Sequence, residues 1–154
     1  MRRTEKEIVD KDVIEEILTK SEICRIAMID RDEPYIVPLN YGYSENVIYF
    51  HSASEGRKIE LLKANNRVCF EIENTTEIVR KDEPCKWTTK YRSLIGHGNI
   101  EIISDTESKK IGLNIIMSKY GYDGQGKYNE GSLSRMVLLK LKIEKITGKQ
   151  SGNW

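Results

Sequence analysis

Residues 23–52 read ICRIAMIDRDEPYIVPLNYGYSENVIYFHS, and this stretch decides the fold class. It contains three runs rich in β-branched and aromatic residues, at 23–29, 34–43 and 47–52, with turn-forming residues around 30–34 and 44–46. Turns this short join antiparallel neighbours, because a parallel pair needs a crossover of a dozen or more residues. The stretch therefore predicts three strands of an antiparallel meander.

The rest of the chain adds helices and strands on both sides of this meander. Amphipathic patterns and capping residues predict helices at 11–20, with Asp10 or Asp12 as N-cap, at 54–62, and at 106–120, with Asp105 as N-cap and Gly121 after the last turn. Further strands are expected at 68–73, 87–103 and 136–146, with loops at 75–86 and 121–131. Residues 1–10 are interpreted as an N-terminal extension and 147–154 as a C-terminal tail of one domain, 1–154. The fold class is therefore mainly β with peripheral helices, a six-stranded antiparallel barrel.

The composition argues against nucleic-acid-binding, membrane and secreted proteins. Among 154 residues, 25 Lys and Arg balance 24 Asp and Glu, so the chain lacks the concentrated positive field of a dedicated nucleic-acid-binding protein. No apolar run reaches 18 residues, and no apolar segment follows the basic N-terminus, so neither a membrane span nor a secretory signal is expected. A cytoplasmic protein with no nucleic-acid or membrane partner is the resulting expectation.

The three cysteines, Cys24, Cys69 and Cys85, are interpreted as reduced thiols, because an odd number in a chain of this length does not indicate a disulfide framework. No CxxC or HxxxH pair accompanies the two histidines, so no metal site is expected. The glycine patterns of dinucleotide-binding and P-loop folds are also absent.

The most informative functional stretch is 47–62, where a strand turns directly into a helix at Gly56, Arg57 and Lys58. Free N–H groups at a helix start, a glycine and two cations together favour a phosphate site. A capped surface helix with solvated basic residues is also compatible with this sequence. The residues alone therefore leave both interpretations open, a phosphate site and a surface helix. His51 ends the strand beside this turn, where it could orient an aromatic ring or move a proton, or serve a structural role.

Two other clusters could contact a ligand. Residues 38–43, PLNYGY, mix amide, aromatic and glycine groups that could cover a flat heterocycle, although strand aromatics also serve simple packing. In residues 87–93, strand alternation places Arg92 and Lys90 on one face and Tyr91 and Ser93 on the other. An anionic ligand held between subunits would suit this cluster, and a solvent-facing edge is the alternative.

Four blocks in this order and spacing resemble the pyridoxamine 5′-phosphate oxidase-like FMN-binding split-barrel superfamily, and in particular its nitroimidazole-resistance branch. The blocks are Arg2-Arg3, residues 36–43 (IVPLNYGY), residues 49–58 (YFHSASEGRK) and residues 91–98 (YRSLIGHG). The resemblance extends over most of the chain. It implies a six-stranded split barrel that forms a homodimer, with FMN bound in clefts shared by the two subunits.

The resemblance also assigns roles to residues. Arg57 and Lys58, beside Gly56, correspond to phosphate ligands, with help from Arg92 and Ser93. The ribityl chain and isoalloxazine ring would be lined by Pro38, Leu39, Asn40 and Tyr41 and by His51, Ser52 and Ala53, with Tyr91 nearby. Trp154 would either stack over the flavin from the partner chain or be disordered. His51 near the flavin is the candidate catalytic residue.

Three functions remain as hypotheses. The first is an FMN-dependent oxidoreductase that reduces a small aromatic acceptor such as a nitroimidazole, with electrons from a nicotinamide or another donor. The second is a non-catalytic flavin-binding or redox-sensing dimeric module, and the third is an interaction protein whose barrel is only a scaffold. The superfamily also contains members that use haem, coenzyme F420 or no cofactor, so the resemblance alone does not decide among them.

Overall fold

The computed structural model describes residues 3–124, 126–152 and 154. Its strands are β1 (Glu7–Ile8), β2 (Ile23–Asp30), β3 (Glu33–Asn40), β4 (Gly42–Ser44), β5 (Val47–Ala53), β6 (Arg67–Val79), β7 (Thr88–Ile103) and β8 (Met136–Ser151). Its α-helices are α1 (Lys11–Lys20), α2 (Arg57–Ala64), α3 (Thr106–Lys119) and α4 (Glu130–Ser134), and 3-10 turns lie at Thr4–Lys6 and Pro84–Lys86.

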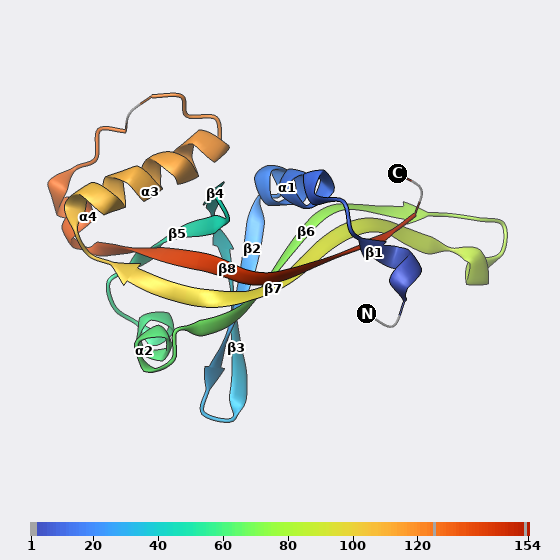
Figure 1. Cartoon of the computed structure of the whole chain (residues 1–154), viewed down its shortest axis with the longest axis horizontal. Helices are drawn as coiled ribbons and strands as arrows, with labels where there is room; N and C mark the ends of the chain where they lie inside the picture. Colours follow the sequence, from blue (N-terminus) through green and yellow to red (C-terminus); the bar gives the residue numbers. More distant parts are fainter. Residues whose placement is uncertain (1–2, 125, 153) are drawn as a thin grey trace.

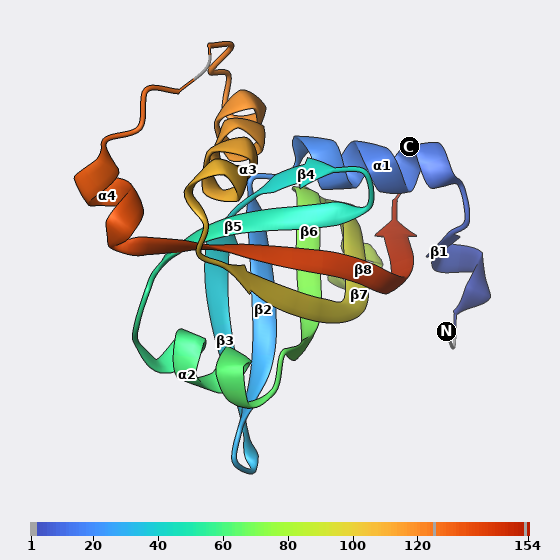
Figure 2. The ribbon, with the colours of Figure 1, turned by 60° about the vertical axis from the view of Figure 1, so that its left-hand side comes forward.

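The strands form one antiparallel sheet in the order β3-β2-β6-β7-β8-β5-β4, with β1 paired to β8. Figures 1 and 2 show that this sheet curves strongly, so that β5 and β8 pass across β2 and β3. The mainly β, antiparallel split-barrel class predicted from the sequence is confirmed. The described strands number eight rather than six, because a short β1 forms and the run 34–43 divides at Tyr41 into β3 and β4.

The core fills the inside of the curved sheet. Alternating residues of β2, β5, β6 and β8 point inward, and the largest fully buried side chains include Ile26, Phe50 and Phe70. This alternation is the period-2 signal on which the strand predictions depended. The outward residues of β2, β3 and β7 include three isoleucines that stay exposed, Ile29, Ile36 and Ile95.

Helix caps follow the predicted residues. The side chain of Asp10 accepts from the N–H of Asp12, and the side chain of Asp105 accepts from the N–H of Ser108. Helix α1 has the predicted bounds, and α3 ends one residue earlier than predicted. Helix α2 begins at Arg57, with Gly56 at its N-cap, and ends at Ala64, so it lies two to three residues beyond the predicted range 54–62. The short helix α4 was not predicted, because five residues after a glycine-rich loop carry little periodic signal.

Two segments expected to be loop or tail are strand. Strand β6 continues from the predicted 68–73 through Val79, and β8 continues from 146 through Ser151. Both extensions pair with β7, from Val79 opposite Thr88 to Ser151 opposite Tyr91. Residues 147–151 are polar and become strand by pairing with a long neighbour, whereas four of residues 75–79 are β-branched and favour a strand themselves. Figure 1 shows the resulting ribbon of β6 and β7 extending away from the barrel. Strand β7 itself is continuous, and its register with β8 shifts between His97 and Gly98.

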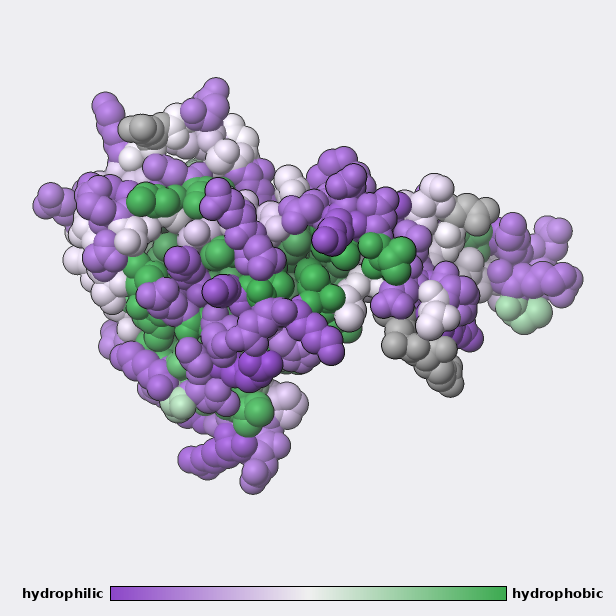
Figure 3. Space-filling model, in the orientation of Figure 1, coloured by the Kyte–Doolittle hydropathy of each residue, from purple (hydrophilic) through white to green (hydrophobic). Residues whose placement is uncertain are grey.

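The surface mixes polar and apolar areas. Figure 3 shows hydrophobic atoms gathered mainly over and below α3 in this orientation, among hydrophilic residues. In the part of the chain that the structure describes, no helix is both long and apolar enough to span a membrane.

Candidate functional site

The end of β5 and the start of α2 form one exposed corner. His51 and Ala53 point outward, whereas Ser52 between them is buried. The turn that follows is fixed by a hydrogen bond from the N–H of Ser54 to the carbonyl of Arg135, at 3.2 Å. This arrangement places an exposed histidine six residues before the first residue of a helix. We call His51, Gly56, Arg57 and Lys58 the β5–α2 corner.

The first turn of α2 is open to a ligand. Gly56 has φ +110°, a left-handed conformation that favours glycine, and no atom lies within 4 Å of where its Cβ would stand. The carbonyl of Gly56 accepts from Ile59 and Glu60, and no side chain caps the helix. The N–H groups at the start of a helix have no acceptor within the helix. The geometry of this corner is therefore compatible with binding an anion such as a phosphate.

Arg57 is already paired. Its Nε donates to Oδ2 of Asp30 at 2.7 Å, its Nη2 donates to Oδ1 of the same carboxylate, and Glu60 lies 3.7 Å from Nη1. The guanidinium holds the pKa of Asp30 below its usual value. The hairpin joining β2 to β3 is thereby connected to α2, and an incoming phosphate would have to share Arg57 with Asp30.

Lys58 has no such partner. No ion pair or hydrogen bond of its ammonium group occurs among the described residues, and the side chain is half-buried. Burial lowers its pKa. A phosphate at the helix start would give this unpaired cation a counter-charge, so the residues of the corner fit the phosphate of FMN.

The predicted ligand-lining residues of β3 separate by strand alternation. Pro38 and Asn40 face outward and are exposed, and Leu39 packs against the core. Asn40 donates from Nδ2 to the hydroxyl of Tyr120 at 3.1 Å. Tyr41 is fully buried, and its hydroxyl donates to the carbonyl of Leu18 at 2.8 Å. The side chain of Tyr41 therefore belongs to the core, while Pro38 and Asn40 are available at the surface.

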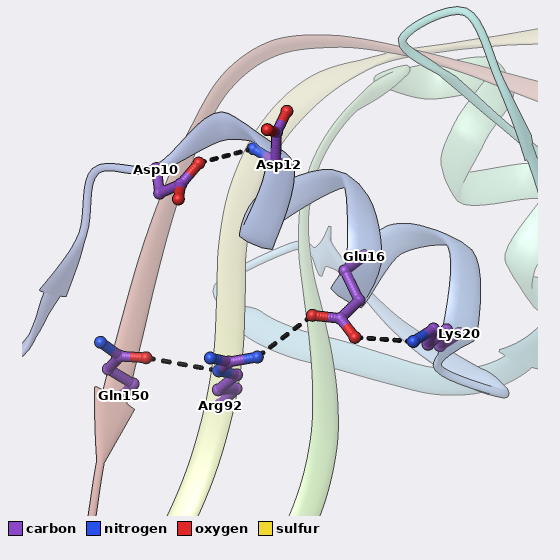
Figure 4. Close-up of polar contacts among 6 residues, drawn as sticks. All are labelled: Asp10, Asp12, Glu16, Lys20, Arg92 and Gln150. Atoms are coloured by element: carbon purple, nitrogen blue, oxygen red, sulfur yellow. Dashed lines mark hydrogen bonds and ion pairs between the residues drawn. The ribbon is translucent and has the colours of Figure 1, made fainter. Parts of the chain in front are cut away.

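Arg92 belongs to a polar network under α1. Its Nη1 donates to Glu16 at 3.2 Å and its Nε to Gln150 at 3.3 Å, and Glu16 also pairs with Lys20 at 2.7 Å (Figure 4). Figure 4 also shows Asp10 and Asp12 at the start of the same helix. The ring of Trp154 lies 4.0 Å from the guanidinium carbon of Arg92, a cation–π contact.

Lys90 shares this ring, since its Nζ is 4.4 Å from the ring centroid of Trp154. Trp154 therefore packs against Lys90 and Arg92 of its own chain. Tyr91 and Ser93 point to the opposite face of β7, as the alternation predicted, and both are half-buried.

Arg92 and Arg57 lie far apart in one chain. Arg92 is opposite Asn74 on β6, whereas Asp30, which holds Arg57, lies three residues beyond Ala27, which is opposite Cys69. The separation along the sheet is eight residues, or about 26 Å at 3.3 Å per residue. The predicted phosphate ligands therefore divide into the β5–α2 corner and a distant group of Arg92, Ser93 and Trp154. One chain cannot bring both groups to one phosphate.

Sequence reasoning missed the partners that fix these residues. Asp30 and Glu16 orient Arg57 and Arg92, and Tyr120 connects α3 to Asn40. Each contact joins residues at least 27 positions apart, so no local pattern could reveal it. Among the residues that the structure places, no group of three or more His, Cys, Asp or Glu could hold a metal ion, and all three cysteines are free.

This chain matches a known protein family and resembles several solved structures. The sequence pattern of the pyridoxamine 5′-phosphate oxidase family matches residues 10–150. A structure from Bacteroides thetaiotaomicron, described as a candidate 5-nitroimidazole antibiotic resistance protein, is 33% identical, with a TM-score of 0.83 over 94% of this chain and 86% of that one.

More distant structures share the fold. A FAD- and haem-binding protein from Mycobacterium smegmatis has a TM-score of 0.86 at 16% identity, over 97% of this chain and 75% of that one. A flavocytochrome from Azotobacter vinelandii has a TM-score of 0.83 at 17% identity, over 99% of this chain and 72% of that one.

A curated relative from Rhizobium meliloti, an uncharacterised protein, is 29% identical over 65 residues, which span 42% of each chain. The resemblance carried by the sequence blocks is confirmed by the family match and by the Bacteroides structure. The chain belongs to the pyridoxamine 5′-phosphate oxidase family.

Proposed function

We propose that this protein is a flavoprotein that binds FMN at the β5–α2 corner and reduces a small aromatic acceptor, such as a nitroimidazole. The observation that carries the proposal is the open helix start at Gly56, with the unpaired cation of Lys58 beside it. The flavin-binding names of two proteins with this fold and the nitroimidazole-resistance description of a 33% identical one support the choice of ligand and acceptor.

Each residue of the corner has a distinct role in this proposal. The N–H groups at the start of α2 and the ammonium group of Lys58 bind the phosphate. Arg57 adds a charge-assisted donor, which the phosphate shares with Asp30. FMN, when bound, supplies the electron-transfer chemistry. His51, exposed at the end of β5, is positioned to hold or deliver a proton for the acceptor.

A homodimer is part of the proposal. The outer face of β2, β3 and β7 exposes Ile29, Ile36 and Ile95, at 63%, 59% and 50%. Register places Ile36 opposite Ala27, and Ala27 opposite Cys69, so these residues adjoin across β3, β2 and β6, and the ion pair of Arg25 with Glu71 at 3.0 Å lies between them and Ile95. Burying this face against a second copy would stabilise both chains. A partner chain would also bring part of the distant group to a corner that one chain cannot reach with its own, either Arg92 and Trp154 on one face of β7 or Ser93 on the other.

The first test is the visible spectrum of the freshly purified protein, followed by release and chromatography of any pigment. We expect flavin bands and released FMN. A colourless protein that fails to take up added FMN would contradict the proposal. Reduction of the bound flavin by a nicotinamide donor and its reoxidation by a nitroimidazole, faster than with free FMN, would establish an enzyme. Binding without such turnover would instead leave the non-catalytic flavin-binding module.

A second test locates the phosphate. Riboflavin lacks the phosphate, so we expect the unmodified protein to bind it at least about tenfold more weakly than FMN. Lys58→Gln should remove most of this preference, because it deletes the unpaired cation. Lys63→Gln, at the exposed last turn of the same helix, is the matched control and should keep it. Equal affinity for riboflavin and FMN would place the phosphate elsewhere.

A further inference from the structure

A separate cleft of about 600 Å³ opens between α1, β4 and α3. Figures 1 and 2 show these elements side by side, although they lie far apart in the sequence. Six polar residues face this cleft: Thr19, Tyr43, Ser44, Asn114, Ser118 and Lys119. None of them belongs to the β5–α2 corner. We call this hollow the Lys119 cleft.

The floor of the Lys119 cleft is rigid. At Gly42, at the start of β4, an added Cβ would stand only 2.7 Å from the backbone nitrogen of Ile116, so glycine lets β4 press directly against α3. The hydroxyl of Tyr120 donates to the carbonyl of Glu22 at 2.6 Å and lies 3.2 Å from the N–H of Tyr41, which donates to it. The end of α3 is thereby fixed to the sheet immediately after Lys119.

Lys119 lines this cleft and carries a half-buried ammonium group without a counter-ion. Its Nζ donates to the carbonyl of Leu18 at 2.9 Å and lies 3.1 Å from the centroid of the Tyr41 ring. No carboxylate pairs with it among the residues that the structure describes. The third N–H of the ammonium group is left without a protein acceptor. Burial lowers the pKa of Lys119 to about 7.

The titratable groups around Lys119 are neutral or already engaged. Burial raises the pKa of the thiol of Cys24, on β2, and that of the Tyr41 hydroxyl, so both stay uncharged near neutral pH. Burial also raises the pKa of Tyr43 to about 12, and its hydroxyl donates to the carboxylate of Glu15, on α1, at 2.7 Å. The missing counter-charge is therefore not supplied by the surrounding elements.

The remaining polar groups of the cleft favour an anion. Oδ1 of Asn114 accepts from the N–H of Gly126 at 3.2 Å and from the hydroxyl of Tyr128 at 2.8 Å, which leaves its NH₂ group as a donor. The hydroxyls of Ser44 and Ser118 make no hydrogen bond among the described residues and can donate as well. One cation, several neutral donors and no lining carboxylate suit a singly charged carboxylate, and Ile115 adds an apolar wall for its organic part.

We propose that the Lys119 cleft is a second small-molecule site, which binds an organic carboxylate through the ammonium group of Lys119. The carboxylate accepts from Lys119 with one oxygen and from the neutral donors of the cleft with the other. The site does not depend on the proposed flavin function, because it shares no residue with the β5–α2 corner.

The probe for this site is benzoate, with benzamide as a neutral molecule of nearly the same shape. Both are titrated by calorimetry into the full chain at pH 6.5, where Lys119 is mostly protonated. We expect benzoate to bind and benzamide to bind at least about tenfold more weakly. Binding should take up protons at pH 7.5, because the carboxylate favours the charged lysine, and the affinity should fall by pH 8.5. Equal affinities, or no binding of benzoate at about 10 mM, would overturn the proposal.

Variants locate the binding. Lys119→Met should abolish benzoate binding, whereas Lys110→Met, on the same helix but outside the cleft and paired with Glu107, should keep it. Should Lys119→Met fail to fold, Ser118→Leu tests the same cleft, because the exposed serine is replaced by a side chain that fills the hollow. Loss of binding in Lys58→Met with retention in both cleft variants would show that benzoate occupies the β5–α2 corner, and the proposal would be wrong.

Discussion

Arg57 holds Asp30 by two parallel contacts, from Nε to Oδ2 at 2.7 Å and from Nη2 to Oδ1. An arginine binds phosphate in the same two-contact geometry, so the carboxylate of Asp30 and a phosphate would compete for the same N–H donors of Arg57. The carboxylate of Asp30 keeps the cation ordered, and it also places a negative charge beside the expected phosphate. The second effect should outweigh the first, because the N–H groups of α2 and Lys58 hold the phosphate without help from Asp30.

Asp30→Asn should therefore tighten FMN binding by about two- to fivefold at low salt, since it removes the charge and keeps one hydrogen-bond acceptor. The measurement is quenching of flavin fluorescence on titration. Asp32→Asn, in the same hairpin, changes the net charge equally without touching Arg57 and should have little effect. A weaker affinity in Asp30→Asn alone would mean that Asp30 positions Arg57 for the phosphate.

The apolar outer face predicts a specific dimer variant. Ile36→Lys puts a charge on the edge strand of this face, beside Ala27 and Cys69, and we expect the dissociation constant of the dimer to rise at least about tenfold. Ile111→Lys, on α3, replaces an isoleucine of nearly equal exposure outside this face. Sedimentation velocity over a range of protein concentrations measures both. If the two variants behave alike, the face of β2, β3 and β7 is not the interface.

His51 can be tested for a proton-carrying role apart from binding. His51→Ala should slow turnover of a nitroaromatic acceptor by about 10- to 100-fold while FMN stays bound, because the residue lies outside the phosphate site. His51→Gln keeps hydrogen-bonding groups but cannot carry a proton, so its rate should match that of the alanine variant. A glutamine variant with unchanged kinetics would assign His51 a role in orientation only.

The fold was largely predictable because its signals are local. Alternation in 23–29 and 47–52, the caps at Asp10 and Asp105, and the short turns between strands all appear within a few residues. The continuation of β6 to Val79 was missed although four of residues 75–79 are β-branched, because the stretch 75–86 as a whole is polar and contains Pro84. The separation of the two predicted ligand groups was also hidden, because it follows from the register of β2, β6 and β7 rather than from any motif.

The corner itself was predictable for a different reason. A strand end, a glycine and two cations within eight residues are enough to place a helix start beside an exposed histidine. The Lys119 cleft had no such signal. Its cation comes from the end of α3, its aromatic ring from Tyr41 and its carbonyl acceptor from α1, so only the packing of three distant segments creates it.

Lys119 also predicts how stability changes with pH. Its pKa is about 7 in the folded protein and near 10.4 in the unfolded chain, so between these values the unfolded state binds more protons. The free energy of unfolding should therefore rise with pH from about 7 relative to a variant without the group. The measurement is urea unfolding of the wild type and Lys119→Met at pH 6.5, 7.5 and 8.5; unfolded cysteines begin to ionise near the top of this range, but both proteins contain the same three, so that effect cancels in the difference. The difference, wild type minus variant, should increase across this range. Lys110→Met, compared in the same way, should give a difference that stays constant, and a constant difference for Lys119→Met would show that its ammonium group is not disfavoured by folding.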